Sequence, residues 1–348
     1  MKIYRTILTL LLVLVCVGCT AEKQQKVEEK PTGMDAEYEE IRAITDIKEG
    51  QHNVYVIIKA WGNSYWDGIL NGAADAGNDM GCNVYAGGVC EEDNGDRQGA
   101  LIDQAVEMGA DAIVLAPVNL PPVVNAIEAA NEKNVPVIFV DTIIDTSKFE
   151  ACYMTDNMTA GEMAAEEMLS KLKKMGKSET ESLSVGIQAG STSSQTIIDR
   201  IAGFMSYWTI NAPENWKVLD DVKINNGDVE LAEKYGDDLM NDYSDLSGIY
   251  SCNNGSTVGS VKSITSSGRN DVVLVGFDYS DEMQAMLKSG KYSVSTIVQR
   301  QYNMGYEGVQ TAAKAEKPQL KFVDTGITLI NQDNVFSDEI VKELEMAG

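Results

Sequence analysis

The sequence predicts an α/β protein with two lobes, each built around a parallel sheet. From Val54 onward, short apolar runs alternate with amphipathic stretches of helical length. Continuous apolar runs are typical of strands in a parallel sheet, because helices cover both of its faces. The alternation fills two successive parts of the chain, and a length of 348 residues suits about two domains. We therefore expect two similar lobes with a ligand cleft between them.

The first half contains four apolar runs separated by helices, followed by a loop that reaches Met154. Gly77, Gly81 and Gly109 stand where helices should end. The expected strands are 54–58, 83–86, 112–115 and 135–140, and the expected helices are 65–80, 97–108 and 121–133.

The second half repeats this plan, and so predicts a second lobe of the same kind. Its expected strands are 183–188, 217–222, 248–251, 272–277 and 292–298, and its expected helices are 159–173, 196–211, 229–243, 256–266 and 282–289.

The charge balance excludes several classes of partner. Lys and Arg total 28 against 53 acidic residues, so the surface is strongly anionic. Such a surface repels nucleic acids and anionic lipid headgroups. A DNA-binding regulator is further excluded because no basic helix-turn-helix stretch occurs.

The N-terminal residues have the order of a secretory signal. Lys2 and Arg5 precede an apolar run that ends at Gly18-Cys19 and is too short to be a confident membrane span. The stretch Cys16-Val-Gly-Cys19 resembles a bacterial lipobox, although Cys16 stands where that motif usually has Leu. The resemblance implies a signal peptide over residues 1–18, a lipidated Cys19 and an extracytoplasmic protein anchored to the cell membrane. Plain secretion with cleavage nearby is the alternative.

Residues 19–50 are polar and charged and are predicted to form a flexible tether. About thirty flexible residues reach roughly 30 Å, enough to lift a domain off the membrane. A three-residue spacing of Tyr38, Ile41, Ile44 and Ile47 leaves a short helix within it as an alternative.

Cysteine and histidine usage argues against a cofactor, a metal or catalysis. Cys82, Cys90, Cys152 and Cys252 permit disulfides in an exported protein, but buried free thiols are favoured because they lie far apart and form no CxxC pair. His52 is the one histidine, and no nucleotide or hydrolase motif is present. We expect no cofactor, no metal and no enzyme.

The stretch Lys59-Ala-Trp-Gly-Asn-Ser-Tyr-Trp66 follows the first apolar run. Ligands of open parallel sheets bind beyond the carboxyl ends of the strands. Trp61, Tyr65 and Trp66 can cover the apolar face of a ring, while Lys59 and Asn63 can bond its polar groups. This stretch is therefore predicted to form the mouth of the cleft.

From about residue 52 to 328 the chain resembles the type I periplasmic sugar-binding proteins, the ribose- and galactose-binding group that serves ABC importers. The resemblance rests on five segments in order, which are Gly109-Ala-Asp-Ala-Ile-Val-Leu-Ala-Pro117, Asn134-Val-Pro-Val-Ile-Phe-Val-Asp141, Thr155-Asp-Asn157 with Gly161, Val275-Gly-Phe-Asp278, and Gln299 ahead of Tyr302-Asn-Met-Gly305. It implies lobes of residues 51–155 plus 300–328 and of residues 156–299 plus 329–348. Three crossovers would join them, and hinge closure would trap a sugar between them.

The resemblance also implies which residues contact the ligand. It places ligand positions at Lys59, Asn63, Tyr65, Trp66, Asp141, Thr142, Asn253, Asp278 and Gln299. Asp accepts bonds from hydroxyls, and Asn and Gln both donate and accept, so these residue types suit a sugar. Capping of the following helices is the alternative for Asp141, Asn253 and Asp278.

Two departures from the ribose-binding pattern bear on specificity. Ribose-type members have Asp-Arg where this chain has Asp141-Thr142, and their helix Arg matches Ile198, with Arg200 beyond it. We expect Arg200 to pair with Asp199 or Glu214 instead. Because guanidinium forks are lost and Lys59 is added, the ligand is not expected to be ribose, and anionic, amino-substituted or larger sugars are conceivable.

The predicted function is that of a monomeric lipoprotein that hands a small carbohydrate to an ABC permease. One rival is a receptor of the same fold that presents a sugar or signal molecule to a membrane sensor. The other is a carbohydrate-active enzyme that uses Asp141 and Asp278 as acid and base. The tryptophans also have a structural alternative, since Trp61 and Trp66 could be core wall residues, while Trp208 and Trp216 are expected to serve packing.

Overall fold

The computed structural model describes residues 41–62, 64–89, 94–314 and 321–347. The predicted signal peptide, Cys19, Asn63 and Cys90 lie outside the described residues. No helix within the described ranges is both long enough and apolar enough to cross a membrane.

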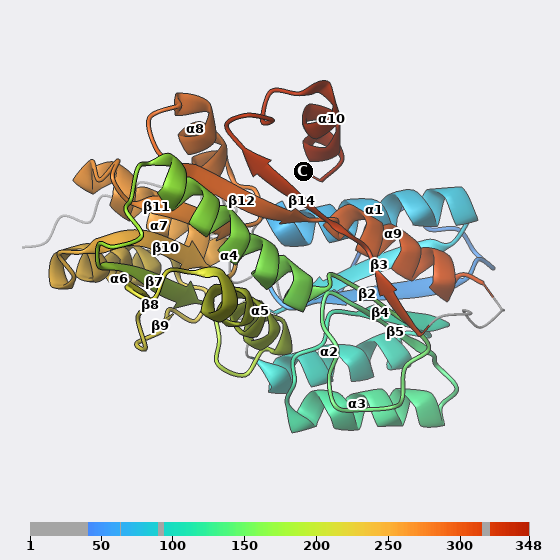
Figure 1. Cartoon of the computed structure of the whole chain (residues 1–348). Helices are drawn as coiled ribbons and strands as arrows, with labels where there is room; N and C mark the ends of the chain where they lie inside the picture. Colours follow the sequence, from blue (N-terminus) through green and yellow to red (C-terminus); the bar gives the residue numbers. More distant parts are fainter. Residues whose placement is uncertain (1–40, 63, 90–93, 315–320, 348) are drawn as a thin grey trace, which may run out of the picture. The chain divides into compact units, whose positions relative to one another are not determined.

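Lobe 1 is built on a seven-stranded sheet with the order β1-β3-β2-β4-β5-β6-β13. All neighbouring strands pair in parallel except β1 with β3. Figure 1 shows α1 lying along α9, and α2 beside α3. Its elements are β1 (Arg42–Ala43), β2 (Asn53–Ile58), α1 (Ser64–Met80), β3 (Asn83–Gly88), α2 (Gly95–Glu107), β4 (Ala112–Leu115), α3 (Pro121–Glu132), β5 (Val137–Val140), β6 (Cys152–Met154), α9 (Gln301–Ala312) and β13 (Phe322–Asp324).

Lobe 2 is built on a second sheet with the order β14-β12-β11-β10-β7-β8, and β9 also pairs with β7. Its pairs are parallel except β12 with β14. Its elements are α4 (Asn157–Lys174), β7 (Leu183–Ala189), α5 (Gln195–Asn211), β8 (Trp216–Val218), β9 (Lys223–Ile224), α6 (Val229–Asp242), β10 (Leu246–Ser251), α7 (Asn254–Ser267), β11 (Val273–Phe277), α8 (Asp281–Ser289), β12 (Val294–Gln299), β14 (Ile327–Asn331) and α10 (Asp338–Ala347).

Each sheet has a hydrophobic core on both faces, because successive strand side chains point to opposite sides. In β2, Val54, Val56 and Ile58 pack in the core that includes α1 and α9 residues, whereas Tyr55 and Ile57 pack in the core of α2 and α3. The sheet of lobe 2 is covered in the same way. The predicted fold class, two α/β lobes with mostly parallel sheets, is confirmed.

The chain passes between the two sheets three times. The first passage, between residues 154 and 157, joins β6 to α4, and the second, between 299 and 301, joins β12 to α9. The third lies between 324 and 327, from β13 to β14. At the first passage Asp156 caps α4, since its side chain accepts a bond from the Thr159 amide.

Several short elements were not predicted, and one expectation is wrong. Residues 41–50, expected to belong to the tether, begin with β1, and the Ile44 amide also bonds Val84 O at 2.9 Å. These residues join the fold because the edge of β3 offers free backbone groups. No helix forms over residues 41–50. The strand expected at 217–222 is replaced by β8 and β9, and β6, β13, β14, α9 and α10 were not among the expected elements.

Glycines bring one pair of helices in each lobe into very close contact. A Cβ on Gly72 of α1 would lie 2.0 Å from the Tyr302 carbonyl oxygen of α9, and one on Gly305 would lie 1.9 Å from the Ile69 oxygen. In lobe 2 a Cβ on Gly161 of α4 would lie 2.1 Å from the Arg200 oxygen of α5. Only glycine permits such an approach. It fixes the helices that carry Tyr65 and Arg200.

Three cysteines and two tryptophans lie buried, as expected from the sequence. Cys82, Cys152 and Cys252 are buried free thiols. Trp208 and Trp216 belong to a core cluster of lobe 2, and the Trp208 indole donates to Trp216 O. Both tryptophans therefore serve packing, as expected.

Candidate binding site

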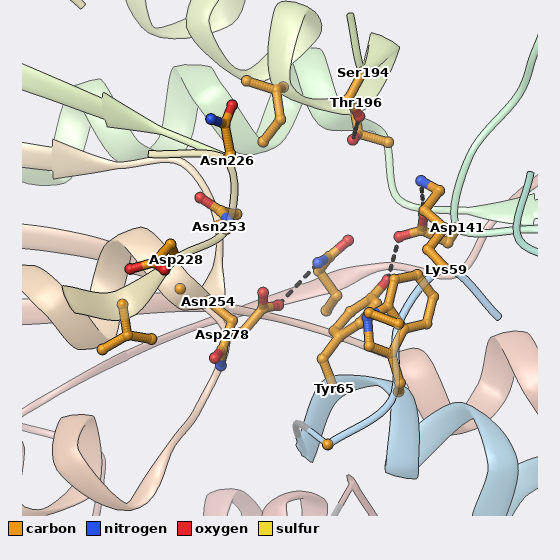
Figure 2. A pocket seen from close by; sticks show the side chains of 18 of the residues that line it. Lys59, Tyr65, Asp141, Ser194, Thr196, Asn226, Asp228, Asn253, Asn254 and Asp278 are labelled. Carbon is orange, nitrogen blue, oxygen red and sulfur yellow. Dashed lines mark hydrogen bonds and ion pairs between the residues drawn. The ribbon is translucent and has the colours of Figure 1, made fainter. Parts of the chain in front are cut away.

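A cavity of about 390 Å³ is lined by residues of both lobes. Lys59, Asp141 and Asp278 directly follow β2, β5 and β11, and Gln299 is the last residue of β12. The carboxyl ends of parallel strands meet at one edge of a sheet, which explains why these side chains gather there. Figure 2 shows Lys59, Tyr65 and Asp141 on one side of the cavity and Asn253 and Asp278 on the other.

On the lobe 1 side, Asp141 accepts three hydrogen bonds. Its carboxylate lies 2.6 Å from Tyr65 Oη, 2.7 Å from Lys59 Nζ and 2.5 Å from Thr142 Oγ1. Lys59 Nζ also donates to Thr142. Burial alone would raise the pKa of Asp141, but the Lys59 charge and these bonds outweigh burial and hold the pKa below its ordinary value. The Lys59 charge is therefore matched by Asp141 within the protein.

On the lobe 2 side, Asp278 is buried with a weaker set of partners. Gln299 Nε2 donates to its Oδ1 at 2.9 Å. Burial raises the pKa of Asp278 to about 6, against the opposing charge of Arg200 and the bond from Gln299, and the Asp141 charge raises it further. Gln299 Oε1 has no hydrogen-bond partner among the described residues and is buried. Gln299 lines the cavity, so this oxygen is a candidate acceptor for a ligand donor.

Arg200 lines the cavity, and the expectation that it pairs with Asp199 or Glu214 is wrong. It is 3% exposed, whereas Ile198 is 44% exposed. Its Nε donates to Asn157 Oδ1 at 2.8 Å, and its Nη1 donates to Cys252 O at 2.7 Å. The guanidinium also lies 4.0 Å from the centre of the Phe277 ring.

The helical period of α5 contains the signal that would have placed Arg200 correctly. Ile197, Arg200 and Phe204 are buried and follow the i, i+3, i+7 spacing of one helix face. Ile198 is one position away, which rotates it off that face. Extending the buried face from Ile197 and Phe204 by helical spacing would have selected Arg200 rather than Ile198.

The capping alternative is wrong for both aspartates. Asp141 bonds side chains of its own cluster, and α8 is capped by Ser280, not by Asp278. Asn253 does hold the N-cap position of α7, but its side chain makes no capping bond. It accepts instead from Ser256 Oγ, which in turn accepts from Asn225 Nδ2 at 2.7 Å.

The aromatic side chains that line the cavity come from the first loop and the start of α1. Trp66 is 3% exposed, belongs to a lobe 1 core and packs edge-to-face on Tyr65 with ring centres 4.9 Å apart. Trp61 is half-buried, with the Arg42 guanidinium 4.6 Å from its ring centre. Both therefore combine packing with a place on the cavity wall.

Most of the predicted site residues line this cavity, and further residues that line it were not predicted. Thr142 touches Asp141 and Lys59 but lines a separate small recess, and Asn63 lies outside the described residues. The residues of lobe 2 that line the cavity without having been predicted are Ser194, Thr196, Ile197, Arg200, Asn226, Gly227, Asp228, Val229, Asn254 and Gly255. Apart from Arg200, they lie on loops, at helix caps and in first helical turns, where sequence patterns are weakest.

Two α/β lobes that jointly line a polar cavity at their strand ends define a two-lobed ligand-binding protein. The family model for the periplasmic binding protein domain matches residues 54–318. The chain belongs to this family, and the resemblance inferred from the sequence is confirmed.

Similar proteins agree with this assignment. The ribose import binding protein of Bacillus subtilis is 24% identical over 221 residues, which cover 64% of this chain and 68% of that protein. A carbohydrate transporter solute-binding protein from Agrobacterium radiobacter, solved with D-arabinose, is 28% identical with a TM-score of 0.77, covering 85% of this chain and 99% of that one. An ABC transporter solute-binding protein from Agrobacterium vitis with bound D-fucose is 26% identical with a TM-score of 0.75, covering 83% and 98%.

Proposed function

We propose that this protein is an extracytoplasmic solute-binding protein that captures a small carbohydrate and delivers it to an ABC importer. The relatives support this directly, since their names include ribose import and their solved structures hold D-arabinose and D-fucose. The observation that carries the proposal is the pair of buried aspartates, Asp141 and Asp278, which reach one cavity from different lobes.

The cavity has the chemistry that a sugar ring requires. Asp141 and Asp278 accept bonds from hydroxyl groups, Asn253 both donates and accepts, and Gln299 Oε1 remains available as an acceptor. Tyr65 and Trp66 offer ring surface to the apolar C–H face of a sugar. Several hydrogen bonds with one stacked face support a micromolar dissociation constant, about −8 kcal/mol.

Hinge closure is the expected response to binding. A ligand shifts an equilibrium only when it binds one state better, and a sugar touching both lobes binds the closed state better. The three passages between the sheets are short and so suit hinges.

We further propose that Cys19 carries the lipid anchor and that residues between it and the fold act as the tether. The lipobox-like stretch before Cys19 supports the first point. Because β1 belongs to the sheet of lobe 1, the proposed tether ends before Arg42. We expect a monomer.

A thermal-shift screen of monosaccharides, amino sugars, sugar acids and oligosaccharides tests the function. A ligand that binds only the folded protein raises the melting temperature by mass action. We expect at least one neutral sugar to do so, and calorimetry on that sugar then gives its affinity. A protein whose melting temperature responds to no carbohydrate would contradict the proposal.

A further inference from the structure

A second cavity, of about 730 Å³, adjoins the one described above. Gly62, Val229 and Asn254 line both, so the two cavities meet at these residues. Gly62 presents no side chain at this junction, and its φ of 83° is a conformation that favours glycine. A ligand held in the first cavity, here called the inner cavity, can therefore extend past Gly62 into the second, here called the outer cavity.

The walls of the outer cavity come mainly from lobe 2. Apart from Gly62, its lining belongs to lobe 2, from α6, α7, α8 and the C-terminal segment. That segment is fixed to lobe 2, because Val335 and Ile340 are buried in its core and Leu344 packs against it. Hinge closure moves the walls formed by α6, α7 and α8 as one body, whereas α10 also contacts α1 and α9 of lobe 1.

The lining of the outer cavity is mixed, as a carbohydrate requires. Val258, Val335 and Leu344 provide apolar contact, while Glu282 and Gln284 on α8 provide hydrogen-bonding groups. Sugar rings have apolar C–H faces and hydroxyl edges, so both kinds of wall are useful. A purely aliphatic ligand would instead leave the polar groups of α8 without partners.

We propose that the outer cavity is a second sugar subsite, so that the preferred ligand is a disaccharide or a glycoside rather than a free monosaccharide. One ring occupies the inner cavity between Asp141 and Asp278. The glycosidic bond passes Gly62, and the second ring or the aglycone lies against α8 and the C-terminal segment. This inference rests on the proposed function, since it requires that the inner cavity hold a sugar.

Calorimetry with matched pairs of ligands tests the subsite. The pairs are D-glucose with cellobiose, D-xylose with xylobiose, D-galactose with lactose, and L-arabinose with arabinobiose. For at least one pair we expect the disaccharide to bind about tenfold or more tightly than its monosaccharide, because the second ring buries further apolar surface and gains hydrogen bonds.

A variant that fills the outer cavity separates this subsite from the inner one. Val341 lines the outer cavity, does not line the inner one and is 42% exposed, so we expect the fold to tolerate Val341→Trp. We expect it to remove the advantage of the disaccharide and to leave monosaccharide affinity within about twofold. Glu339→Trp is the control, because Glu339 is an exposed residue of α10 that does not line the cavity.

The possible outcomes separate the two proposals. A protein that binds monosaccharides at least as tightly as every matched disaccharide overturns the subsite and leaves the proposed function standing. Equal loss of mono- and disaccharide binding in Val341→Trp also overturns it. Failure of every sugar to bind overturns both.

Discussion

Asp141 and Asp278 occupy equivalent places in the two lobes but have opposite electrostatic environments. Each follows a central strand and adopts a left-handed backbone, with φ of 65° and 66°. Asp141 is neutralised by Lys59, whereas Asp278 has a pKa of about 6 because burial dominates over its partners. In the unliganded protein, one cavity therefore contains an ionised carboxylate that stabilises the fold, Asp141, and one whose ionisation destabilises it, Asp278.

Replacing Asp278 with Asn is expected to stabilise the unliganded protein. The pKa of Asp278 is raised from 3.8 to about 6 on folding, so its contribution to stability falls as the pH rises through that range. Two pKa units correspond to about 3 kcal/mol, so Asp278→Asn should gain about 2–3 kcal/mol at pH 7. The gain should shrink as the pH approaches 4.

Urea unfolding of wild type and Asp278→Asn between pH 4 and pH 8, without ligand, measures this gain. A difference in unfolding free energy that does not vary with pH would show that the carboxyl group is not destabilised by burial. The contribution of Asp141 to the unfolding free energy should change with pH in the opposite direction. Because folding lowers the pKa of Asp141, its ionised carboxylate stabilises the protein, and that stability is lost as the pH falls through the folded pKa.

Arg200→Lys is expected to weaken ligand binding about tenfold or more. Lysine cannot reproduce the two directed bonds to Asn157 and Cys252 O, so the charge beside Asp278 would move. Calorimetry with the sugar found by screening tests this. Arg269→Lys is the control, since Arg269 pairs with Asp271 away from the cavity. Unchanged affinity in Arg200→Lys would exclude a role for its geometry.

Sequence reasoning located the strand-end residues of the candidate site better than those on helices and loops. Asp141, Asp278 and Gln299 could be placed by the resemblance to the sugar-binding family, and they lie together because parallel strands end at one edge of a sheet. Arg200 was misplaced because a shift of two residues on a helix moves a side chain to another face. Asn226 and Asp228 were missed, since a loop carries no periodic pattern that fixes where its side chains point.

At the scale of the elements, the glycine contacts between helices set the geometry beneath the site. The α1–α9 contact involves the helix that carries Tyr65, whose hydroxyl also donates to Met304 Sδ of α9. The α4–α5 contact places Gly161 against the backbone of Arg200 itself. A side chain at either contact must push two backbones apart.

Gly72→Ala is therefore expected to destabilise the protein by about 1–3 kcal/mol or more, because overpacking against a backbone has no cheap relief. Asn71→Ala, at the neighbouring exposed position of α1, introduces no close contact and should change the unfolding free energy little. Urea unfolding of the two variants measures the difference. Equal stabilities would show that the helices can separate without cost.

Long elements were predicted within a few residues, whereas short ones were not. The strands β2 and β4 have continuous apolar runs, and α1 and α5 have helical spacing. β1, β6 and β13 have two or three residues each, too few to show any period. Their pairing depends on neighbouring strands, which a local pattern does not contain.

At the scale of the whole molecule, the two-lobed plan could be predicted because each lobe repeats the same alternation. The identity of the ligand could not, since it depends on how side chains from distant segments share one cavity. The outer cavity shows this most clearly. It brings α8 together with C-terminal residues that no motif marked.

Binding is expected to make the molecule more compact. A sugar that contacts both lobes would favour the closed state over any state in which the lobes are apart. Small-angle X-ray scattering should show a smaller radius of gyration at saturating sugar than without it. An unchanged radius of gyration with calorimetrically proven binding would contradict hinge closure.

The central claim is that Asp141 and Asp278 together hold a carbohydrate, and titration calorimetry tests it most directly. Asp141→Asn and Asp278→Ala are compared with wild type, and Asp145→Ala, at an exposed position, is the control. Asparagine at position 141 removes the charge that pairs with Lys59, as alanine would, but it keeps a side-chain oxygen that can accept the Lys59 hydrogen bond. We predict micromolar binding by wild type and the control, and at least about a hundredfold loss in the other two. Wild-type affinity in either folded variant would contradict the account.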